Sequence, residues 1–425
     1  MKEKTNLKKW EKIFIIISCV VIGISFFFYL YRLIHYYRIE HVKYKVNTLI
    51  QEITNDVVKT GDGLHILDED NYFYKGIDVS NYVWYSGNLY RIVSIKETDI
   101  RLISDSNLTV IAWGPNNKYN ESYLYSWLNN YEENKSIYLD LVNNYQVYLK
   151  EFNYCNSSIN KKCINNDKYL VSLLTRSEYL NAGGKLSFLN NESNYWIIDD
   201  TNELEKAYVF KEGGIGSETE GSLSSFGVRP VITINGNITN FEGKGTKEDP
   251  YIIKETSGET LKEKRMGEYV KYKDYVFRIS NKYENGIKLV TEKKLDDLVL
   301  SNYDIAYYLN YRFITNFENV GTCTYYVGTY GSNTNYDYKE ALNKTTDASV
   351  GLLSVGDLFL GDDEGYWLYT NYDQNDLVFK LNTNSTIIAD TKYTQNGIRP
   401  VICLKGDIKV TSGSGTKESP YVLGE

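Results

Sequence analysis

The hydrophobic pattern begins with an uncharged apolar run from Ile13 to Tyr31. Its length is what a helix needs to span a bilayer, and its aromatic end suits a membrane–water interface. We therefore predict a transmembrane helix over residues 13–34, after a basic cytoplasmic tail over residues 1–12. A cleaved signal peptide fits less well, because the run is long and lacks a small-x-small site. A lipoprotein signal at Cys19 is a second alternative. It fits less well, because a lipoprotein would turn polar after the cysteine and here the apolar run continues well past it.

Basic residues flank this run on both sides. Five lysines precede it, which favours a cytoplasmic N-terminus and places the C-terminal domains outside the cell membrane. Four basic residues also follow it, which reduces the charge difference on which the topology prediction rests. They are Arg32, Arg38, Lys43 and Lys45.

Beyond the run, apolar residues recur at intervals of three and four positions, the spacing of one helix face. We predict a stalk helix over residues 35–60 that continues the transmembrane helix and lies against the first domain. A dimer zipper is the alternative interpretation. The residues of this stripe are Ile39, Val42, Val46, Leu49 and Ile53.

From Asp70 the pattern becomes that of short strands separated by turns. We predict strands at residues 82–85, 89–95 and 100–103, followed by a short helix at 123–129. Leu173-Leu174 then predicts a strand that leads through an N-cap at Thr175 into another helix. Strands containing Tyr195-Trp196 and Tyr208-Val209-Phe210 follow.

One cassette occurs twice in the chain. Residues 227–232 (Gly-Val-Arg-Pro-Val-Ile) and 245–252 recur 170 positions later at 397–402 and 415–422. These segments contain four of the five prolines of the chain. Fixed-interval similarity of this kind indicates a tandem duplication. We predict two α+β domains with mostly antiparallel sheets, over residues 72–254 and 267–424, joined by a linker at 255–266.

Several motifs resemble bacterial surface domains related to the C-type lectin-like fold. They are the helix ending in Trp127-Leu128-Asn129, the Leu-Leu-Thr-x-x-Glu turn at 173–178, Tyr195-Trp196, a Val-x-Phe strand and the closing Gly-Val-Arg-Pro strand. More narrowly, the segment from Tyr74 through Arg91-Ile92 together with the cassette resembles an uncharacterised exported repeat domain of Gram-positive bacterial surface proteins. The resemblance implies two tandem C-type-lectin-like domains.

The second copy departs further from this pattern. Lys271 stands at the position of Trp84, Tyr308 at that of Trp127, and Val355-Gly356-Asp357 replaces Arg176-Ser177-Glu178. If one copy binds a ligand, the first is the better candidate.

The net charge of −8 conceals a basic N-terminal segment. Residues 1–45 hold nine Lys and Arg against three Asp and Glu, so the rest of the chain is strongly acidic. An acidic folded region is a poor partner for phosphate backbones, so we expect no nucleic-acid binding.

Cysteine spacing predicts one loop-closing disulfide between Cys155 and Cys163, as expected for an exported domain. Cys323 and Cys403 either form a second bridge or leave Cys403 as a buried thiol. The chain has no CxxC pair and no histidine after His65, so we predict no metal site and no cofactor.

The same shortage of histidine excludes Ser-His-Asp and Cys-His catalysis from both domains. Paired carboxylates for glycoside cleavage remain an alternative, carried by the acidic run Asp199, Asp200, Glu203 and Glu205, although such a run is usually a solvated face. Because histidine is missing from both domains and an acidic run is usually solvated, we expect no enzyme. The proline-containing tripeptide that calcium-dependent lectin relatives use to bind sugars is also missing from the sequence.

The candidate ligand-binding surface is Trp113 with Tyr119 and Tyr123, because a tryptophan in a Gly/Pro/Asn loop is expected to be exposed. We interpret Trp84, Trp127, Trp196 and Trp367 as core aromatics. The repeated Arg229-Pro230 and Arg399-Pro400 are interpreted as structural, each arginine pairing with a carboxylate or carbonyls where the domain closes.

The sequence thus predicts a single-pass membrane protein whose extracellular domains bind a glycan or a cell-surface protein without catalysis. A structural subunit of a surface assembly is the alternative, and a carboxylate-based glycan hydrolase is the third hypothesis. The oligomeric state is left open.

Overall fold

The computed structural model describes residues 8–41, 47–129, 138, 148–157, 167–217, 224–254, 258–295, 298–331, 336–361, 364–372 and 376–424. The chain divides into two compact units, residues 1–47 and residues 48–425.

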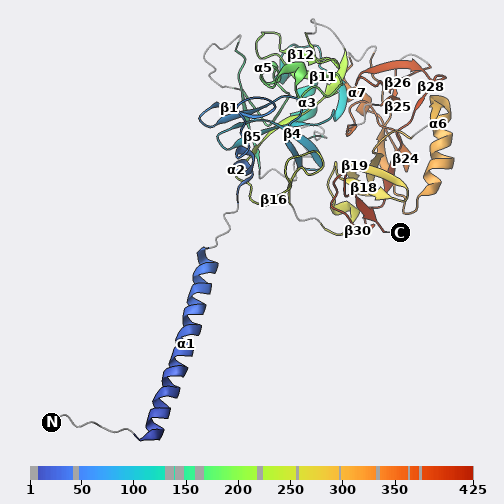
Figure 1. The fold of residues 1–425 in the computed structure, drawn as a ribbon. Helices are drawn as coiled ribbons and strands as arrows, with labels where there is room; N and C mark the ends of the chain where they lie inside the picture. Colours follow the sequence, from blue (N-terminus) through green and yellow to red (C-terminus); the bar gives the residue numbers. More distant parts are fainter. Residues whose placement is uncertain are drawn as a thin grey trace. The chain divides into compact units, whose positions relative to one another are not determined.

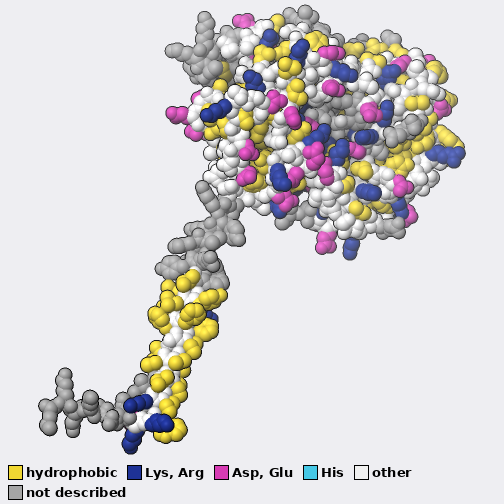
Figure 2. All heavy atoms as spheres, in the orientation of Figure 1, with side chains coloured by type: hydrophobic (Ala, Val, Ile, Leu, Met, Phe, Trp, Pro, Cys, Tyr) yellow, Lys and Arg dark blue, Asp and Glu magenta, His cyan; other side chains and the backbone are white. Residues whose placement is uncertain are grey.

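The described part of the first unit contains one long helix, α1 (Lys9–His41). Its stretch Lys9–Ile34 is long and apolar enough to span a membrane, and this is the one such helix among the described residues. Figure 2 shows hydrophobic side chains covering its surface. A helix that is apolar all round must be surrounded by an apolar medium, which agrees with the predicted transmembrane segment.

The predicted single stalk helix over residues 35–60 is wrong. Residues 42–46 lie outside the described part of the chain, and a separate short helix, α2 (Leu49–Thr54), begins after them. Its N-cap is Thr48, whose side chain forms a capping box with Gln51, so the chain starts a new helix there. Leu49 and Ile53 are buried in the second unit, and the amide of Leu49 donates to Ile238 O at 2.7 Å. These two positions of the stripe thus pack inside their own chain rather than in a zipper.

The first half of the second unit contains a large, mostly antiparallel sheet (Figure 1). Seven strands run side by side, and only β17 and β3 pair in parallel. Their order across the sheet is β10 (Val171–Ser172), β15 (Val231–Asn235), β5 (Asp99–Ser104), β4 (Asn88–Lys96), β3 (Tyr82–Tyr85), β17 (Tyr251–Ile253) and β16 (Phe241–Glu242); β1 (Gly63–Asp68), β2 (Asn71–Lys75) and β7 (Leu149–Lys150) join at the sides.

A second sheet of five strands completes this half. It contains the predicted Tyr195-Trp196 strand at its centre, in parallel with the strand that leads to Arg229. The order is β13 (Ile215–Ser217), β12 (Lys206–Val209), β11 (Tyr195–Ile198), β14 (Ser225–Val228) and β6 (Thr109–Ala112), and a separate hairpin joins β8 (Phe152–Tyr154) to β9 (Asp167–Tyr169).

The second half has two sheets of the same kind. The larger one is ordered β24 (Val350–Gly351), β29 (Val401–Leu404), β20 (Gly286–Thr291), β19 (Tyr275–Tyr283), β18 (Tyr269–Tyr272), β31 (Tyr421–Leu423) and β30 (Val410–Ser412). The smaller one is ordered β21 (Val299–Ser301), β28 (Gln395–Gly397), β25 (Tyr366–Asn371), β26 (Leu377–Leu381) and β27 (Ile387–Thr391). A separate antiparallel pair consists of β22 (Cys323–Tyr326) and β23 (Thr345–Ala348).

The two halves share one strand order. We number the strands of each sheet by their order along the chain and compare their positions across the sheet. The seven main strands then have the same order in both large sheets, and the five strands have the same order in both smaller sheets. The parallel pairs also correspond, because β17–β3 and β11–β14 match β31–β18 and β25–β28.

The helices are short and few. In the first half the predicted helix at 123–129 is present as α3 (Tyr123–Asn129), and Thr175 caps α5 (Arg176–Asn181) through a capping box with Glu178. The corresponding turn at 354–357 carries no helix, because Gly356 has a φ of +87° and interrupts the helical path. Among the described residues, the remaining helical segments are η1 (Tyr119–Glu121), η2 (Gly184–Leu186), η3 (Leu261–Glu263), α6 (Asn302–Tyr308), the π-helix η4 (Leu309–Phe313), η5 (Ile314–Asn316) and α7 (Tyr338–Leu342).

Candidate functional site at the junction of the two halves

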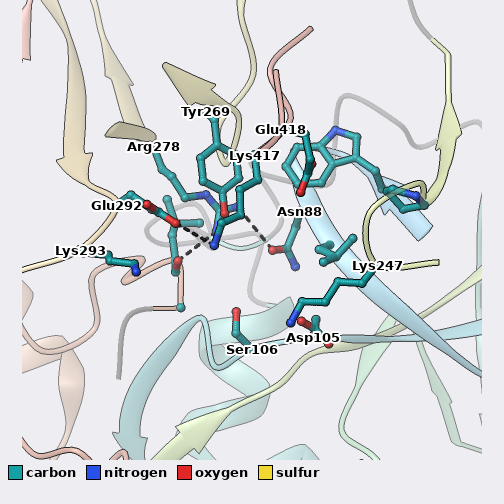
Figure 3. Close-up of a pocket in the computed structure, with 15 residues that line it drawn as sticks. Asn88, Asp105, Ser106, Lys247, Tyr269, Arg278, Glu292, Lys293, Lys417 and Glu418 are labelled. Carbon is teal, nitrogen blue, oxygen red and sulfur yellow. Dashed lines mark hydrogen bonds and ion pairs between the residues drawn. The ribbon is translucent and has the colours of Figure 1, made fainter. Parts of the chain in front are cut away.

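A cavity of about 230 Å³ opens where the two halves of the second unit meet (Figure 3). The first half contributes Trp84 from β3, the segment that follows β5, and the loop before β17. The second half contributes Tyr269 from β18, Arg278 from β19 and the segment that follows β20. Both sides are therefore needed to form its walls.

The halves approach closely beside this cavity. Gly87 has a φ of +69°, and a Cβ placed there would lie 2.1 Å from Met266 O, so only glycine fits the turn between β3 and β4. The Arg278 guanidinium crosses the boundary and donates to Gly87 O at 2.8 Å and to Leu360 O at 2.9 Å. Burial lowers the pKa of Arg278. The guanidinium N–H groups donate to backbone carbonyls, so this arginine stabilises the cavity wall and is not available to bind a ligand.

Two loops of the repeated cassette bring lysines to the cavity. Lys247 and Lys417 occupy the same cassette position, 170 residues apart. Each loop is fixed by a threonine hydroxyl that accepts from a backbone amide: Thr246 Oγ1 from Asp249 N at 3.0 Å, and Thr416 Oγ1 from Ser419 N at 3.2 Å. The loop geometry thus presents the lysine that follows each threonine.

The three lysines of the cavity differ in whether they form an ion pair. Lys417 forms an ion pair of 2.9 Å with Glu292. Burial alone would lower the pKa of Lys417, but the hydrogen bond and the charge of Glu292 outweigh it and raise that pKa. Within the described part of the chain, no ion pair joins Lys247 or Lys293, and Figure 3 shows these two side chains on opposite sides of the cavity.

Aromatic rings form part of the wall near these charges. Trp84 and Tyr269 lie with ring centroids 5.9 Å apart, one from each half. Arg278 stacks over Tyr269, with its guanidinium carbon 4.7 Å from the ring centroid. Asn88 and Ser106 add neutral polar groups to the lining. The lining also includes two further carboxylates, Asp105, which pairs with Arg91 at 3.5 Å, and Glu418. With four basic and three acidic side chains in its lining, the cavity can hold a polar molecule of modest size.

The ligand-binding surface predicted at Trp113 is wrong. Trp113 and Tyr119 are fully buried, and Tyr123 is half-buried. Trp113 packs edge-on against Trp196, with centroids 5.7 Å apart, and its carbonyl accepts from Tyr123 N at 2.7 Å. The Gly/Pro/Asn loop therefore folds over the indole instead of displaying it.

The structural interpretation of the two cassette arginines agrees with their contacts. Both are fully buried and donate to backbone carbonyls. Arg229 Nε reaches Ser104 O at 2.8 Å, and Arg399 Nε reaches Thr291 O at the same distance. The carbonyls of Pro230 and Pro400 accept from Ser104 N and Thr291 N, at 2.9 and 3.0 Å. The tryptophans interpreted as core residues are also buried: Trp84, Trp127, Trp196 and Trp367.

Most of the acidic run at 199–205 serves the local fold. Asp199 is buried, pairs with Arg176 at 3.0 Å and accepts from the Thr201 amide and hydroxyl. Asp200 accepts from Ser177 N, and the buried Glu205 accepts from Tyr119 N at 2.8 Å. Burial raises the pKa of Asp200. Three of these carboxylates are thus occupied, and Glu203 is exposed.

The cysteines divide as follows. Cys323 and Cys403 form a disulfide in the second half, which selects one of the two alternatives for this pair. Cys155 is disulfide-bonded, and its predicted partner Cys163 lies outside the described residues. Cys19 is a free, exposed cysteine on α1. The described residues contain no group of three or more His, Cys, Asp or Glu side chains placed to hold a metal ion.

The sequence interpretation missed the junction cavity. The signal was present in the repeated lysine of the Gly-Thr-Lys-Glu cassette, but nothing in the pattern indicates that both copies face one cavity. Comparisons with protein-family models, with curated proteins and with solved structures find no match to this chain.

Proposed function

We propose that this chain is a single-pass membrane protein with an extracellular, non-catalytic binding module made of two tandem C-type-lectin-like domains. The apolar helix α1 serves as the anchor, with the N-terminus in the cytoplasm. The lysines before α1 support this orientation, and the disulfides of the second unit suit an oxidising compartment.

The tandem arrangement is supported by detail beyond the strand order. Arg229 and Arg399 donate through Nε to the carbonyls of the last residues of β5 and β20. Through Nη1 they also donate to Leu189 O and Phe359 O. These carbonyls lie 170 residues apart, the same interval as the arginines. A repeated sequence that repeats its buried hydrogen bonds is what a duplicated domain would show.

The proposed binding site is the junction cavity, and the proposed ligand is a small acidic molecule, with acidic saccharides as the first class to test. The carrying observation is that Lys247 and Lys293, neither of them ion-paired with a described residue, enter one cavity that also presents Trp84 and Tyr269. Ammonium groups attract a carboxylate or phosphate, and the face of an aromatic ring suits the apolar C–H face of a sugar ring.

The test is titration calorimetry of the full chain in detergent with a glucuronic-acid oligosaccharide and its neutral glucose counterpart. We expect the acidic ligand to bind more tightly, and the double substitution Lys247→Gln with Lys293→Gln to weaken it about tenfold, the effect of losing one good charged contact. Binding should also weaken as salt is raised.

Lys405→Gln is the matched control, because Lys405 is exposed and lies away from the cavity. Binding that survives the double substitution would place the ligand elsewhere. Failure of acidic and neutral ligands alike to bind the folded protein would sink the proposed function.

The hydrolase hypothesis gains no support from the carboxylates at 199–205, three of which are held in structural hydrogen bonds. The assembly hypothesis, by contrast, is favoured by a separate feature of the second half, described next.

A further inference from the structure

Three tyrosines project from one face of the helical segment that begins with α6. Tyr303, Tyr307 and Tyr311 are spaced four residues apart, which places them on one side of the helix. Their exposed fractions are 74%, 60% and 66%. The rings of Tyr307 and Tyr311 lie 5.1 Å apart, so these two side chains form one aromatic surface. In the region of Figure 1 that holds α6, Figure 2 shows hydrophobic side chains at the edge of the globular part.

The corresponding helix of the first half is covered. Ile305 and Leu309 are buried as Leu124 and Leu128 are, which aligns α6 with α3 and Tyr307 with Ser126. In α3, Ser126 Oγ lies 3.2 Å from Tyr338 Oη, and Trp127 Nε1 donates to Gly356 O at 2.8 Å. Both partners belong to the second half of the chain.

The outer face of the last domain in an array is expected to be polar, because no further domain covers it. Here Tyr307 of α6 stands where α3 has Ser126, and Tyr303 stands where Ser122 precedes α3. The equivalent face has therefore gained aromatic area, and no described part of the chain covers Tyr303 or Tyr307 as the second half covers α3. An uncovered face of this composition indicates a partner.

The other side of the second unit offers a matching groove. A hollow of about 300 Å³ lies between β2, β4 and α5, with apolar walls that include Phe73, Ile95 and Ala182. Leu67 at its rim is 66% exposed. Figure 1 shows β1 and α5 on the side of the globular part away from α6.

One acceptor in this groove has no hydrogen-bond donor. Asn71 Oδ1 lines it as a buried acceptor with no partner among the described residues. An unsatisfied buried acceptor is costly, and a tyrosine hydroxyl entering the groove would satisfy it. The apolar walls would receive the ring of the same side chain.

We propose that the α6 tyrosine face of one molecule docks into the β2–β4–α5 groove of a second copy of this chain, so that neighbouring molecules in the membrane assemble head to tail. The two surfaces differ and lie on different sides of the unit, which makes the contact heterologous and allows rings or rows. The inference rests on the proposed tandem arrangement only for the correspondence of α6 with α3.

The first test is photo-crosslinking of the full chain in a membrane, with p-benzoylphenylalanine in place of Tyr307. The expected product is a dimer whose joined peptide contains residues of the groove, within 67–74, 93–96 or 178–182. A crosslink to a different protein, to a glycan, or to another part of the chain would overturn the proposal, as would the absence of any crosslinked dimer.

The second test measures self-association of the full chain in nanodiscs by mass photometry. Tyr307→Ala removes the central ring, and Asn181→Trp fills the groove from an exposed position. Each should weaken association about tenfold, as expected for a central contact residue. Leu204→Ala is the control, because Leu204 is 47% exposed, belongs to the first half and does not line the groove.

Dimers that persist in both variants would come from another contact and would refute the docking mode. Ligand titration of the same variants keeps the two proposals separate, since neither substitution touches the junction cavity.

Discussion

The buried arginines of the cassette hold separate backbone segments together through hydrogen bonds to carbonyls. Arg399 donates to three backbone carbonyls, Thr291 O, Phe359 O and Glu292 O, from a fully buried position. No shorter polar side chain can reach all three from the same backbone position.

We expect Arg399→Gln to lower the free energy of unfolding by about 3 kcal/mol, because buried carbonyls lose their charged donors. Urea unfolding of the full chain checks this. Arg312→Gln is the control, since Arg312 is exposed and should change stability by less than about 0.5 kcal/mol. A loss of similar size in both variants would show that Arg399 has no special structural role.

Single residues also mark where sequence reasoning failed. The structural role of the cassette arginines was predictable, because repetition in a duplicated segment favours architecture over a site. Trp113 was not, because its exposure was inferred from polar sequence neighbours. The indole packs edge-on against the rings of Tyr119 and Trp196, and the contact with Trp196 joins residues distant in sequence.

At the scale of elements, the strands were the most predictable part. Their alternation and turn residues gave β3, β4 and β5 to within one residue, and α3 was placed correctly. The stalk failed because helical spacing persists across the break that the Thr48 capping box introduces. Periodicity reports which residues share a face and does not report where one helix ends and the next begins.

A glycine two positions before the second cassette segment forms the same tight turn in both copies. Gly413 has a φ of +97°, and a Cβ there would lie 2.0 Å from Pro420 O; Gly243 has the same relation to Pro250 O, at 1.9 Å. The turn brings β31 back beside β18, where Tyr421 pairs with Val270. A side chain at this glycine would push the closing strand away from the sheet.

We therefore expect Gly413→Ala to reduce the free energy of unfolding by about 2 kcal/mol, from the positive φ and the steric overlap together. Gly424→Ala is the matched control in the same C-terminal segment, because its Cβ would meet atoms no closer than 3.5 Å. Urea unfolding separates the two. Equal stability of both variants would mean that the turn relaxes without cost.

At the scale of the molecule, the halves are joined by buried polar contacts as well as by packing. Asn107 donates to Ser385 Oγ at 2.8 Å, and Leu108 O accepts from Phe359 N at 2.6 Å. The buried apolar residues of both halves belong to one core cluster. The sequence predicted two repeats, and it carried no signal for this shared interior, because the contacts are made between different faces of the two copies.

A continuous interior makes the stability of each half depend on the other. The disulfide Cys323–Cys403 lies wholly in the second half and closes a loop with a sequence separation of 80. Replacing both cysteines by serine should cost about 4 kcal/mol through the lost restraint on the unfolded chain. If the halves are coupled, the second unit still unfolds in one calorimetric transition at a lower midpoint, and slow amides of β4 and β11 in the first half exchange faster.

Two separate transitions, with only one of them displaced, would show that the halves are independent domains. Cys19→Ser serves as the control because Cys19 lies on α1, outside this unit, and its replacement should leave the midpoint unchanged.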